Sequence, residues 1–488
     1  MLKHKVARGA AHLGLFQLVG KVLDVVSVVV LARILVPEDF GVVALASSAM
    51  LIAAAVTELS AIDVLVQRKE IDEADVDAAF TLNILRGSLV LLAIIALALP
   101  LAWIYNDMRV AHAIMVLASV PFLNSLQSPA LVHTLRQVNY GPTARIMLYG
   151  KLGGNILSIT LALIWPSFWA LVIGLVATSA ISTVWSYRLC PYWPRIRFAG
   201  TKSILGFAGW VTASRIVFTL NQQGDRFFVG YILGKALLGQ YTMGSVISSM
   251  ATYALATPAM RPIFAAMSRL EGDSERMRRA YLQSQQALML LILPIGIGLA
   301  TVATEIVPLL LGNGWDMVVL AIWWLSPVIA LQMMSIPVQA LSMANGKPRL
   351  LTLRETIALA LRLPATLIAA WGFGFLGALV ARSLTGLAVI VMNLFIARSM
   401  IQVGVMRQIF GCWRSLVSAA VMAAAVVLLG QAFAAPPVFA MQILRLAGLI
   451  IAGLTLYGGV HLGFWILAGR PDGAEAFVLG MLRRRGKD

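Results

Sequence analysis

Charged residues are scarce in this chain. Only 12% of its 488 residues are Asp, Glu, Lys or Arg, against about 25% in an ordinary soluble domain. Hydrophobic residues make up 60%, and the mean hydropathy is +0.87. Segments of about 20 apolar residues recur, each long enough to cross a hydrocarbon core of roughly 30 Å. The composition therefore predicts an all-α polytopic membrane protein.

Residues for metal binding and catalysis are also few. Cys190 and Cys412 are too isolated for a disulfide framework or a CxxC site, and the five histidines form no HxxxH or HExxH pattern. No loop contains paired carboxylates, a nucleophile elbow or a glycine-rich phosphate loop, and none is long enough for a catalytic domain. We therefore expect no metal, no cofactor and no enzymatic activity.

One sequence unit occurs twice. Residues 13–41 form an apolar helix with a polar interruption and end in Ile34, Leu35, Phe40 and Gly41. Residues 211–239 repeat this plan and end, at one constant offset, in Ile232, Leu233, Leu238 and Gly239. Membrane transporters are often built from two such repeats, with a polar site between them.

Hydropathy predicts about 14 transmembrane helices, and the repeat predicts that they form two similar, pseudo-symmetric lobes. The expected domains are residues 1–200, 201–400 and 401–488, the last with a basic tail. The expected spans are 11–35, 40–60, 79–101, 110–133, 143–165, 167–188, 206–232, 239–262, 285–311, 317–341, 350–371, 374–398, 413–433 and 441–467.

The net charge of +17 reflects basic residues in alternate loops, not nucleic-acid binding. One set of loops holds most of them, including Lys3, Lys5, Arg8 and the tail at 482–487, whereas the opposite set has little beyond Arg109 and Lys235. Under the positive-inside rule both termini are cytoplasmic, and we expect the basic tail to contact anionic lipid headgroups.

Charges within the predicted spans need an explanation, because each costs at least about 2.5–3.5 kcal/mol at mid-bilayer. Two interpretations stay open. In the first, the charges form structural pairs that hold helices together, as Lys21 and Asp24 could at a spacing of three residues. In the second, they face a water-filled cavity between the lobes, where the cationic excess suits a phosphate or diphosphate.

The second interpretation assigns candidate site residues. The candidates for substrate binding are Lys21, Arg86, Lys151, Arg215, Gln222, Arg226, Arg362 and Arg382. The candidates for ion coupling or charge pairing are Asp24, Asp225 and Glu355.

Two runs carry a family resemblance. LARILVPEDFGVVALA (31–46), followed by ELSAIDVLVQRKEID (58–72), resembles the polysaccharide transporter branch of the multidrug/oligosaccharidyl-lipid/polysaccharide flippase superfamily, the Wzx-like proteins. GDRFFVGYILGKALLGQYTMG (224–244) resembles a family segment in which an Asp opens D-x3-[IV]-G-x-x-L-G, here Asp225, Val229, Gly230, Leu233 and Gly234. The runs indicate the family well and its substrate poorly.

The resemblance implies two six-helix lobes around a central cavity and two added C-terminal spans. It implies a flippase of the bacterial inner membrane that moves an undecaprenyl-diphosphate-linked oligosaccharide between leaflets by alternating access. Its partners would be this lipid-linked substrate, membrane lipids, and glycan polymerases or other polysaccharide assembly proteins. The alternatives are a cation-coupled drug or small-molecule antiporter, a glycan polymerase or ligase, and a scaffold without transport.

The cationic cavity leads to a first prediction. Lys21→Ala and Arg226→Ala should each stop glycan export while the protein remains in the membrane, because each removes a positive charge from the proposed substrate path. Surface glycan and membrane-bound protein are measured together. Wild-type export in both variants would show that the cavity assignment is wrong.

Overall fold

The computed structural model describes residues 2–56, 65, 71–137, 139–198, 208–270, 273–432, 438–470 and 475. The basic tail at 482–487 and most of the run at 58–70 lie outside these residues, as do the side chains of Lys3, Lys5 and Arg8. Every regular element of the described chain is a helix. The chain divides into two compact units, Met1–Thr242 and Met243–Asp488.

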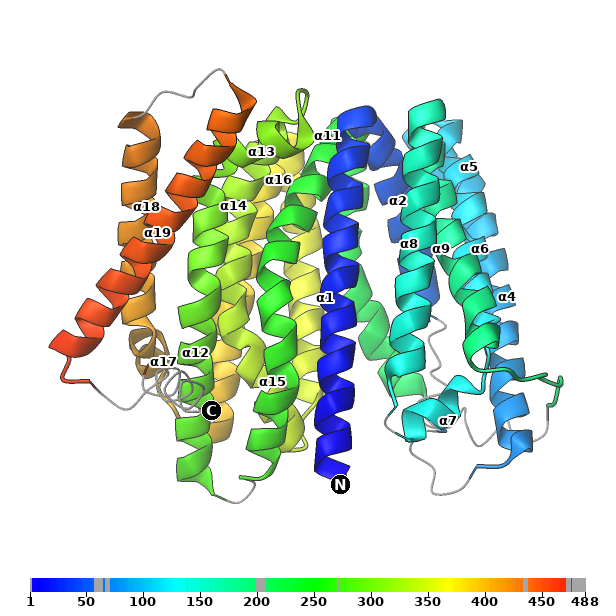
Figure 1. The fold of residues 1–488 in the computed structure, drawn as a ribbon, viewed down its shortest axis with the longest axis horizontal. Coiled ribbons are helices and arrows are strands. Elements are labelled where there is room, and N and C mark those ends of the chain that lie inside the picture. The colour runs from blue at the N-terminus through cyan, green and yellow to red at the C-terminus, as the bar shows by residue number, and fades with distance from the viewer. Residues whose placement is uncertain are drawn as a thin grey trace. The chain divides into compact units, whose positions relative to one another are not determined.

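Among the residues that the structure describes, the first unit contains eight complete helices and the first part of a ninth. Figure 1 labels these helices. They are α1 (Leu2–Ile34), α2 (Pro37–Val56), α4 (Glu73–Tyr105), α5 (Met108–Leu117), α6 (Ser119–Ser125), α7 (Leu131–Arg136), α8 (Gly141–Ile164), α9 (Phe168–Leu189) and the start of α11 (Ala208–Ser268).

The second unit holds the rest of α11 and the helices that follow it. These are α12 (Ser274–Thr301), α13 (Ala303–Leu311), α14 (Asp316–Gln332), the short 3₁₀ helix η1 (Met333–Ser335), α15 (Ile336–Ala344), α16 (Arg349–Ile401), α17 (Val405–Gly411), α18 (Trp413–Ala432) and α19 (Phe439–Leu467). A methionine-rich core that includes Met289, Met333 and Met422 joins α12, α14, α18 and α19.

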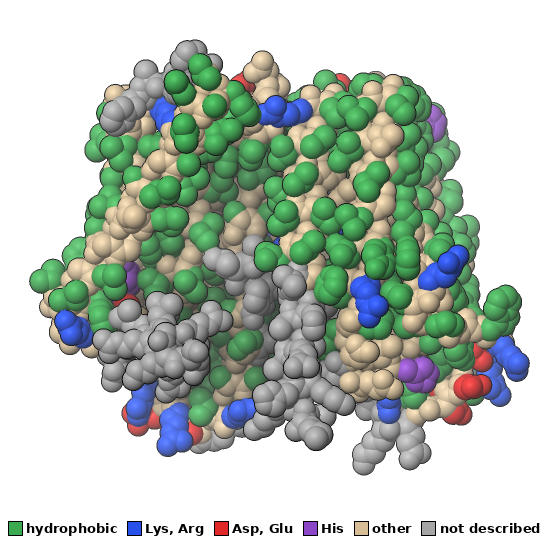
Figure 2. All heavy atoms as spheres, in the orientation of Figure 1, with side chains coloured by type: hydrophobic (Ala, Val, Ile, Leu, Met, Phe, Trp, Pro, Cys, Tyr) green, Lys and Arg blue, Asp and Glu red, His purple; other side chains and the backbone are tan. Residues whose placement is uncertain are grey.

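Ten helical stretches of the described residues are long and apolar enough to cross a membrane. On the face shown in Figure 2, hydrophobic side chains cover the sides of the helices in each unit, and most charged side chains gather at helix ends. The prediction of an all-α polytopic membrane protein is confirmed. The number of 14 spans and the domain boundaries at 200 and 400 stay predictions.

Two charged stretches expected in connections turn out to begin helices. The acidic stretch at 70–77 contains the start of α4, where Asp72 and Asp75 form a capping box. The connection expected at 263–284 is shorter, because α11 continues to Ser268 and Asp273 caps α12. Carboxylates stabilise the first turn of a helix because they accept hydrogen bonds from its free N–H groups and interact favourably with the positive end of the helix dipole.

A single glycine reverses each of the two longest helices. Gly234 in α11 has φ 82° and ψ 170°, and Gly374 in α16 has φ 61° and ψ −140°, conformations that side chains other than hydrogen do not tolerate. Arg354 donates to Asn393 at 2.8 Å, from points almost equally far before and after Gly374. The two halves of α16 therefore run antiparallel, and the predicted spans 350–371 and 374–398 match them.

The two copies of the repeat meet in the first unit. A Cβ atom on Gly41 would overlap the carbonyl oxygen of Lys235, and a Cβ on Gly239 would overlap the carbonyl oxygen of Pro37. The offset that relates Gly41 to Gly239 also relates Pro37 to Lys235. The contact is therefore reciprocal, as across a two-fold axis. In this contact, α2 crosses α11 just beyond the turn at Gly234.

Small residues also bring α8 and α9 together. A Cβ on Gly150 or Gly154 would overlap side chains of α9, namely Ser182 and Thr178 respectively. Ser158 donates to the carbonyl of Ala170 at 2.8 Å from the same face of α8. Close backbone approach of this kind is the usual way for helices to associate in lipid, where apolar burial gives no driving force. The packing fixes α8, which carries Lys151.

The reciprocal contact gives a second prediction. Gly41→Ala should lower the stability of the folded protein by about 1–3 kcal/mol, because its methyl group meets a backbone carbonyl that cannot move aside without shifting α11. Gly458→Ala is the matched control, since a Cβ there meets no atom within 4 Å among the described residues. Thermal denaturation of both variants in detergent measures the effect. Equal midpoints would contradict the close crossing.

Candidate functional site

An ion pair joins α1 and α8 in the first unit. Lys151 Nζ contacts Asp24 Oδ2, with both side chains about one-third exposed. Asn155, one turn further along α8, donates to the carbonyl of Leu23 at 3.4 Å. Asp24 could pair with Lys21 three residues earlier, but in the structure its carboxylate contacts Lys151 of the neighbouring helix. Lys21 lies half-buried on α1.

The predicted polar residues of α11, called the polar stripe here, differ in how far they are exposed. Arg215 is exposed and Gln222 half-buried. Asp225 is buried, and its Oδ2 accepts a hydrogen bond from the Tyr241 hydroxyl at 2.6 Å, across the turn at Gly234. Arg226 is half-buried and reaches Ser48 of α2 at 3.4 Å. The stripe thus makes contacts both within α11 and to α2.

Arg86 lies on α4, half-buried. Its neighbour Gly87 packs against Ser125 of α6 so closely that a Cβ would overlap the hydroxyl. The first unit therefore brings Asp24 and Lys151 together, and its other predicted residues lie on α1, α4 and α11.

The second unit collects its predicted residues along α16. Arg354 pairs with Glu355 and donates to Asn393, and Arg362 is only 4% exposed and donates to Thr385 at 3.4 Å. Glu355, predicted to couple an ion or pair with a charge, thus has its neighbour in sequence, Arg354, as a charge partner.

Tyr253 of α11 marks where these charges converge. Arg382, Glu355 and Arg362 all lie within electrostatic range of its hydroxyl. Three of the predicted residues, all on α16, therefore lie in the neighbourhood of one aromatic side chain of the second unit. Tyr253 itself was not predicted, because a tyrosine in an apolar helix gives no signal in the sequence.

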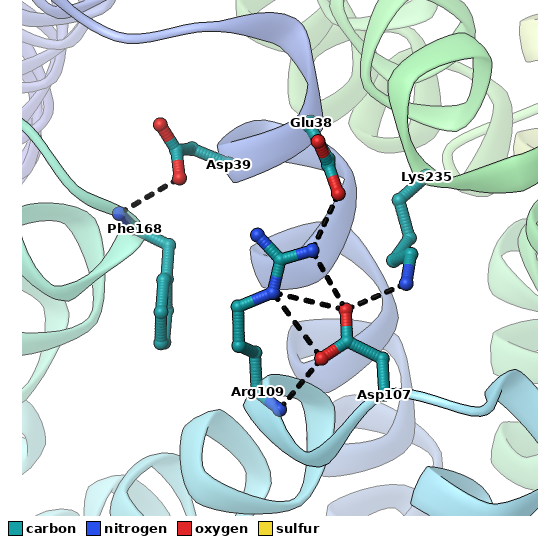
Figure 3. A network of polar contacts seen from close by, with 6 residues as sticks. All are labelled: Glu38, Asp39, Asp107, Arg109, Phe168 and Lys235. Atoms are coloured by element: carbon teal, nitrogen blue, oxygen red, sulfur yellow. Dashed lines mark hydrogen bonds and ion pairs between the residues drawn. The ribbon is translucent and has the colours of Figure 1, made fainter.

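A second network missed by the sequence analysis lies at the start of α2 and α5 (Figure 3). Asp107 caps α5 and accepts hydrogen bonds from the backbone N–H and side chain of Arg109. Lys235 Nζ lies 2.6 Å from the same carboxylate, and Arg109 also contacts Glu38. All four residues belong to the first unit.

The network shifts the ionisation of its central carboxylate. Burial of Asp107 favours the neutral acid, but hydrogen bonds from Arg109 and Lys235 outweigh this and lower its pKa to about 2. Beside the network, Asp39 accepts a hydrogen bond from the backbone N–H of Phe168 at 3.0 Å (Figure 3). The sequence did hold one signal: Arg109 and Lys235 are the two cations noted on the side otherwise poor in basic residues.

The C-terminal helices carry further buried charges. Glu475 contacts Arg414 of α18 at 3.2 Å and His461 of α19 at 3.0 Å, and Arg445 of α19 contacts Glu305 of α13 at 3.5 Å. These pairs tie the last helices to the second unit. Within the described residues, no three His, Cys, Asp or Glu side chains are grouped as metal ligands.

The helix arrangement is similar to that of solved membrane transporters. A lipid II flippase, MurJ, in an inward closed conformation aligns over 94% of this chain and 100% of its own, with a TM-score of 0.73 at 13% identity. A multidrug resistance transporter of the MATE family, facing inward, covers 78% of this chain and 94% of its own, with a TM-score of 0.61 at 14% identity. At these identities the likeness shows the fold alone.

Sequence comparison gives the family. The model of the polysaccharide biosynthesis protein family matches residues 30–320, more than half of the chain, so the chain belongs to this family. The lipopolysaccharide biosynthesis protein WzxC of Escherichia coli strain K12 is 24% identical over 352 residues, 71% of each chain. The succinoglycan biosynthesis transport protein ExoT of Rhizobium meliloti is 23% identical over 295 residues, 60% of each chain. The resemblance to the Wzx-like branch is confirmed.

The Asp107 network gives a third prediction. A carboxylate with a lowered pKa stabilises the fold at every pH above its unfolded value, near 4, and this stabilisation is lost as the pH falls toward about 2. Asp107→Asn should therefore lower the stability by up to about 2 kcal/mol, equally at pH 8 and pH 5. Thermal denaturation across this range measures the difference.

The control is Asp273→Asn, which removes an exposed i,i+3 ion pair with Arg276 and should change stability by less than about 1 kcal/mol. A stability difference for Asp107→Asn that already shrinks between pH 8 and pH 5 would contradict the lowered pKa.

Proposed function

We propose that the protein is a flippase of the bacterial inner membrane that moves a polyprenyl-diphosphate-linked oligosaccharide from the cytoplasmic to the outer leaflet. The family supports a role in polysaccharide biosynthesis, and the relatives named as transport or flippase proteins support transport as that role. Undecaprenyl diphosphate is the carrier that the resemblance implied.

The observation that carries the substrate proposal is the arrangement around Tyr253. Two arginines and one glutamate act on the same hydroxyl, so positive charge exceeds negative charge at this place in the second unit. Arginine binds phosphate oxygens through two parallel N–H donors. Arg362 and Arg382 are therefore proposed to bind the diphosphate, with Glu355 and Arg354 holding the helix in position.

The pair of Lys151 and Asp24 is proposed to contribute from the first unit. The Lys151 and Asp24 side chains are 27% and 34% exposed, so the pair is not enclosed by protein on all sides. Lys151 would contact the anionic headgroup when Asp24 takes up a proton, which would link transport to a proton gradient. Lys21, Arg86, Arg215, Gln222 and Arg226 remain candidates for substrate binding, and Asp225 for coupling.

An apolar pocket supplies a place for part of the lipid chain. A cavity of about 220 Å³ in the second unit is lined almost wholly by apolar atoms, including those of Pro294, Leu299, Met422, Val426 and Leu449. These residues come from α12, α18 and α19. Each buried methylene group contributes about 0.8 kcal/mol, so a polyprenyl segment would bind there through apolar contact.

The drug or small-molecule antiporter is the second candidate, because a MATE transporter shares the fold. It would need an anionic site for cationic drugs, whereas the charged groups at Tyr253 have a positive excess.

Both termini are proposed to be cytoplasmic, since the loops on that side carry most of the basic residues. Glycan polymerases and other polysaccharide assembly proteins are the proposed partners.

The fourth prediction concerns transport in proteoliposomes. Arg362→Gln and Lys151→Gln should each slow translocation of a fluorescent disaccharide linked to undecaprenyl diphosphate by about 10- to 100-fold, because a hydrogen bond to a charged group contributes about 1.5–3 kcal/mol. Translocation is measured as accessibility to a reagent that cannot cross the membrane. Arg276→Gln, at an exposed position, should transport at the wild-type rate.

A double variant separates binding from structure. If the pair of Asp24 and Lys151 is only structural, Asp24→Asn combined with Lys151→Gln should restore transport, because no charge is left unpaired. We expect the double variant to remain inactive. Efflux of a cationic dye by the wild-type protein, without translocation of the lipid-linked sugar, would favour the antiporter instead.

A further inference from the structure

Residues 191–198 follow α9 without regular secondary structure and are called the strap here. Asp77 of α4 fastens its first half, because its Oδ1 accepts from the Tyr192 hydroxyl at 2.9 Å and from the backbone N–H of Arg195 at 3.1 Å. The hydroxyl of Thr81, one helical turn further, accepts from the backbone N–H of Arg197 at 2.8 Å. In Figure 1 the strap leaves the lower end of α9 and projects sideways from the helices of its unit.

The two attachment points give the direction of the strap. Two residues span at most about 7 Å, enough for the roughly 6 Å rise between Asp77 and Thr81 on α4. From its attachment at Asp77 to that at Thr81 the strap therefore runs along α4 toward Tyr105. From Thr81 to the end of α4 at Tyr105 the helix rises about 36 Å, slightly more than a hydrocarbon core of roughly 30 Å. A core that ends near Tyr105 would begin just beyond Thr81, which would put Thr81 at the level of the lipid headgroups.

The side chains of the strap differ in the direction they face. Tyr192 packs inward against Leu65, Val76 and Val132. Outward, Trp193 is 91% exposed, Ile196 72% and Phe198 68%. Three large apolar side chains on one short segment are unusual on a water-facing surface and typical of a surface that binds a partner or a membrane. Tryptophan in particular favours the headgroup level.

Basic side chains alternate with these apolar ones. Arg195 and Arg197 are exposed on the strap, and Arg188 is exposed in the last turn of α9. Two acids act on Tyr192. Asp77 is the attachment point itself, and Glu73 belongs to the first turn of α4 and so precedes Asp77 on the side away from Thr81. Burial and the hydrogen bond to Asp77 raise the pKa of Tyr192 to about 12, so the phenol keeps its proton and the attachment persists at neutral pH.

We propose that the strap is a binding surface for anionic lipid, with Trp193, Ile196 and Phe198 in the headgroup layer and Arg195 and Arg197 on lipid phosphates. The inference does not depend on the transported substrate. Attachment through Asp77 and Thr81 would set the depth of α4 in the membrane at its first turns.

The test measures how deep the strap lies. Nitroxide labels are placed at Trp193→Cys, Leu92→Cys and Lys347→Cys in a Cys190→Ala, Cys412→Ala background reconstituted in nanodiscs. Leu92 is an exposed position midway along α4, and Lys347 lies in an exposed turn, so the two mark lipid and water. We expect the ratio of collisions with oxygen to collisions with a nickel chelate at 193 to exceed that at 347 several-fold.

A second experiment changes the charge of the lipid. Adding phosphatidylglycerol to phosphatidylcholine nanodiscs should raise the ratio at 193, and Arg195→Gln with Arg197→Gln should abolish that rise, because the attraction is electrostatic. If the cysteine-free background does not fold, quenching of intrinsic fluorescence by brominated lipid is compared between the otherwise unaltered protein and Trp193→Phe. Loss of part of the quenching in Trp193→Phe supports the proposal.

Three results would overturn it. A label at 193 that collides with the chelate as often as the label at 347 would place the strap in water. Low collision rates with both reagents would mean that protein covers the surface. Equal quenching in the unaltered protein and in Trp193→Phe would remove Trp193 from the headgroup layer.

Discussion

The reciprocal crossing of α2 and α11 constrains the whole first unit. Gly41 and Gly239 each lie against a backbone carbonyl of the other repeat, at Lys235 and Pro37. This contact sets the position of the turn at Gly234, and the turn places Lys235 beside Asp107. The ion-pair network of Figure 3 therefore depends on two residues that have no side chain. A methyl group at either position would separate the charges as well as the backbones.

Charges inside a membrane protein are acceptable when a partner replaces the lost water. Lys151 has Asp24, and Arg354 has Glu355 and Asn393. Arg445 has Glu305 and Arg414 has Glu475 in the C-terminal helices. These pairs agree with the first interpretation of the intramembrane charges, in which they hold helices together. The water-filled cavity of the second interpretation stays a proposal, and the arginines near Tyr253 are the observation that supports it.

The fold could be predicted from the sequence because every span must contain enough apolar residues to cross the bilayer, and because Gly41 and Gly239 align at one offset. The ion-pair partners of the charged residues were harder to predict. Lys21 and Asp24 are neighbours on one helix, but the carboxylate turns to Lys151, more than a hundred residues away. The spacing of residues along one helix predicts which of them share a face. It does not predict which residue of another helix packs against that face. The network at Asp107 was missed for the same reason, since its members come from α2, α5 and α11.

The reciprocity at Gly41 and Gly239 has a consequence for the origin of the chain. A surface that contacts its own counterpart through the same residues is what a two-fold symmetric homodimer requires. A shorter ancestral protein with a single repeat would have held the elements for this crossing on each copy, and two copies would have formed it by association. Duplication and fusion would then have turned an intermolecular contact into an intramolecular one and freed the two copies to acquire different charges.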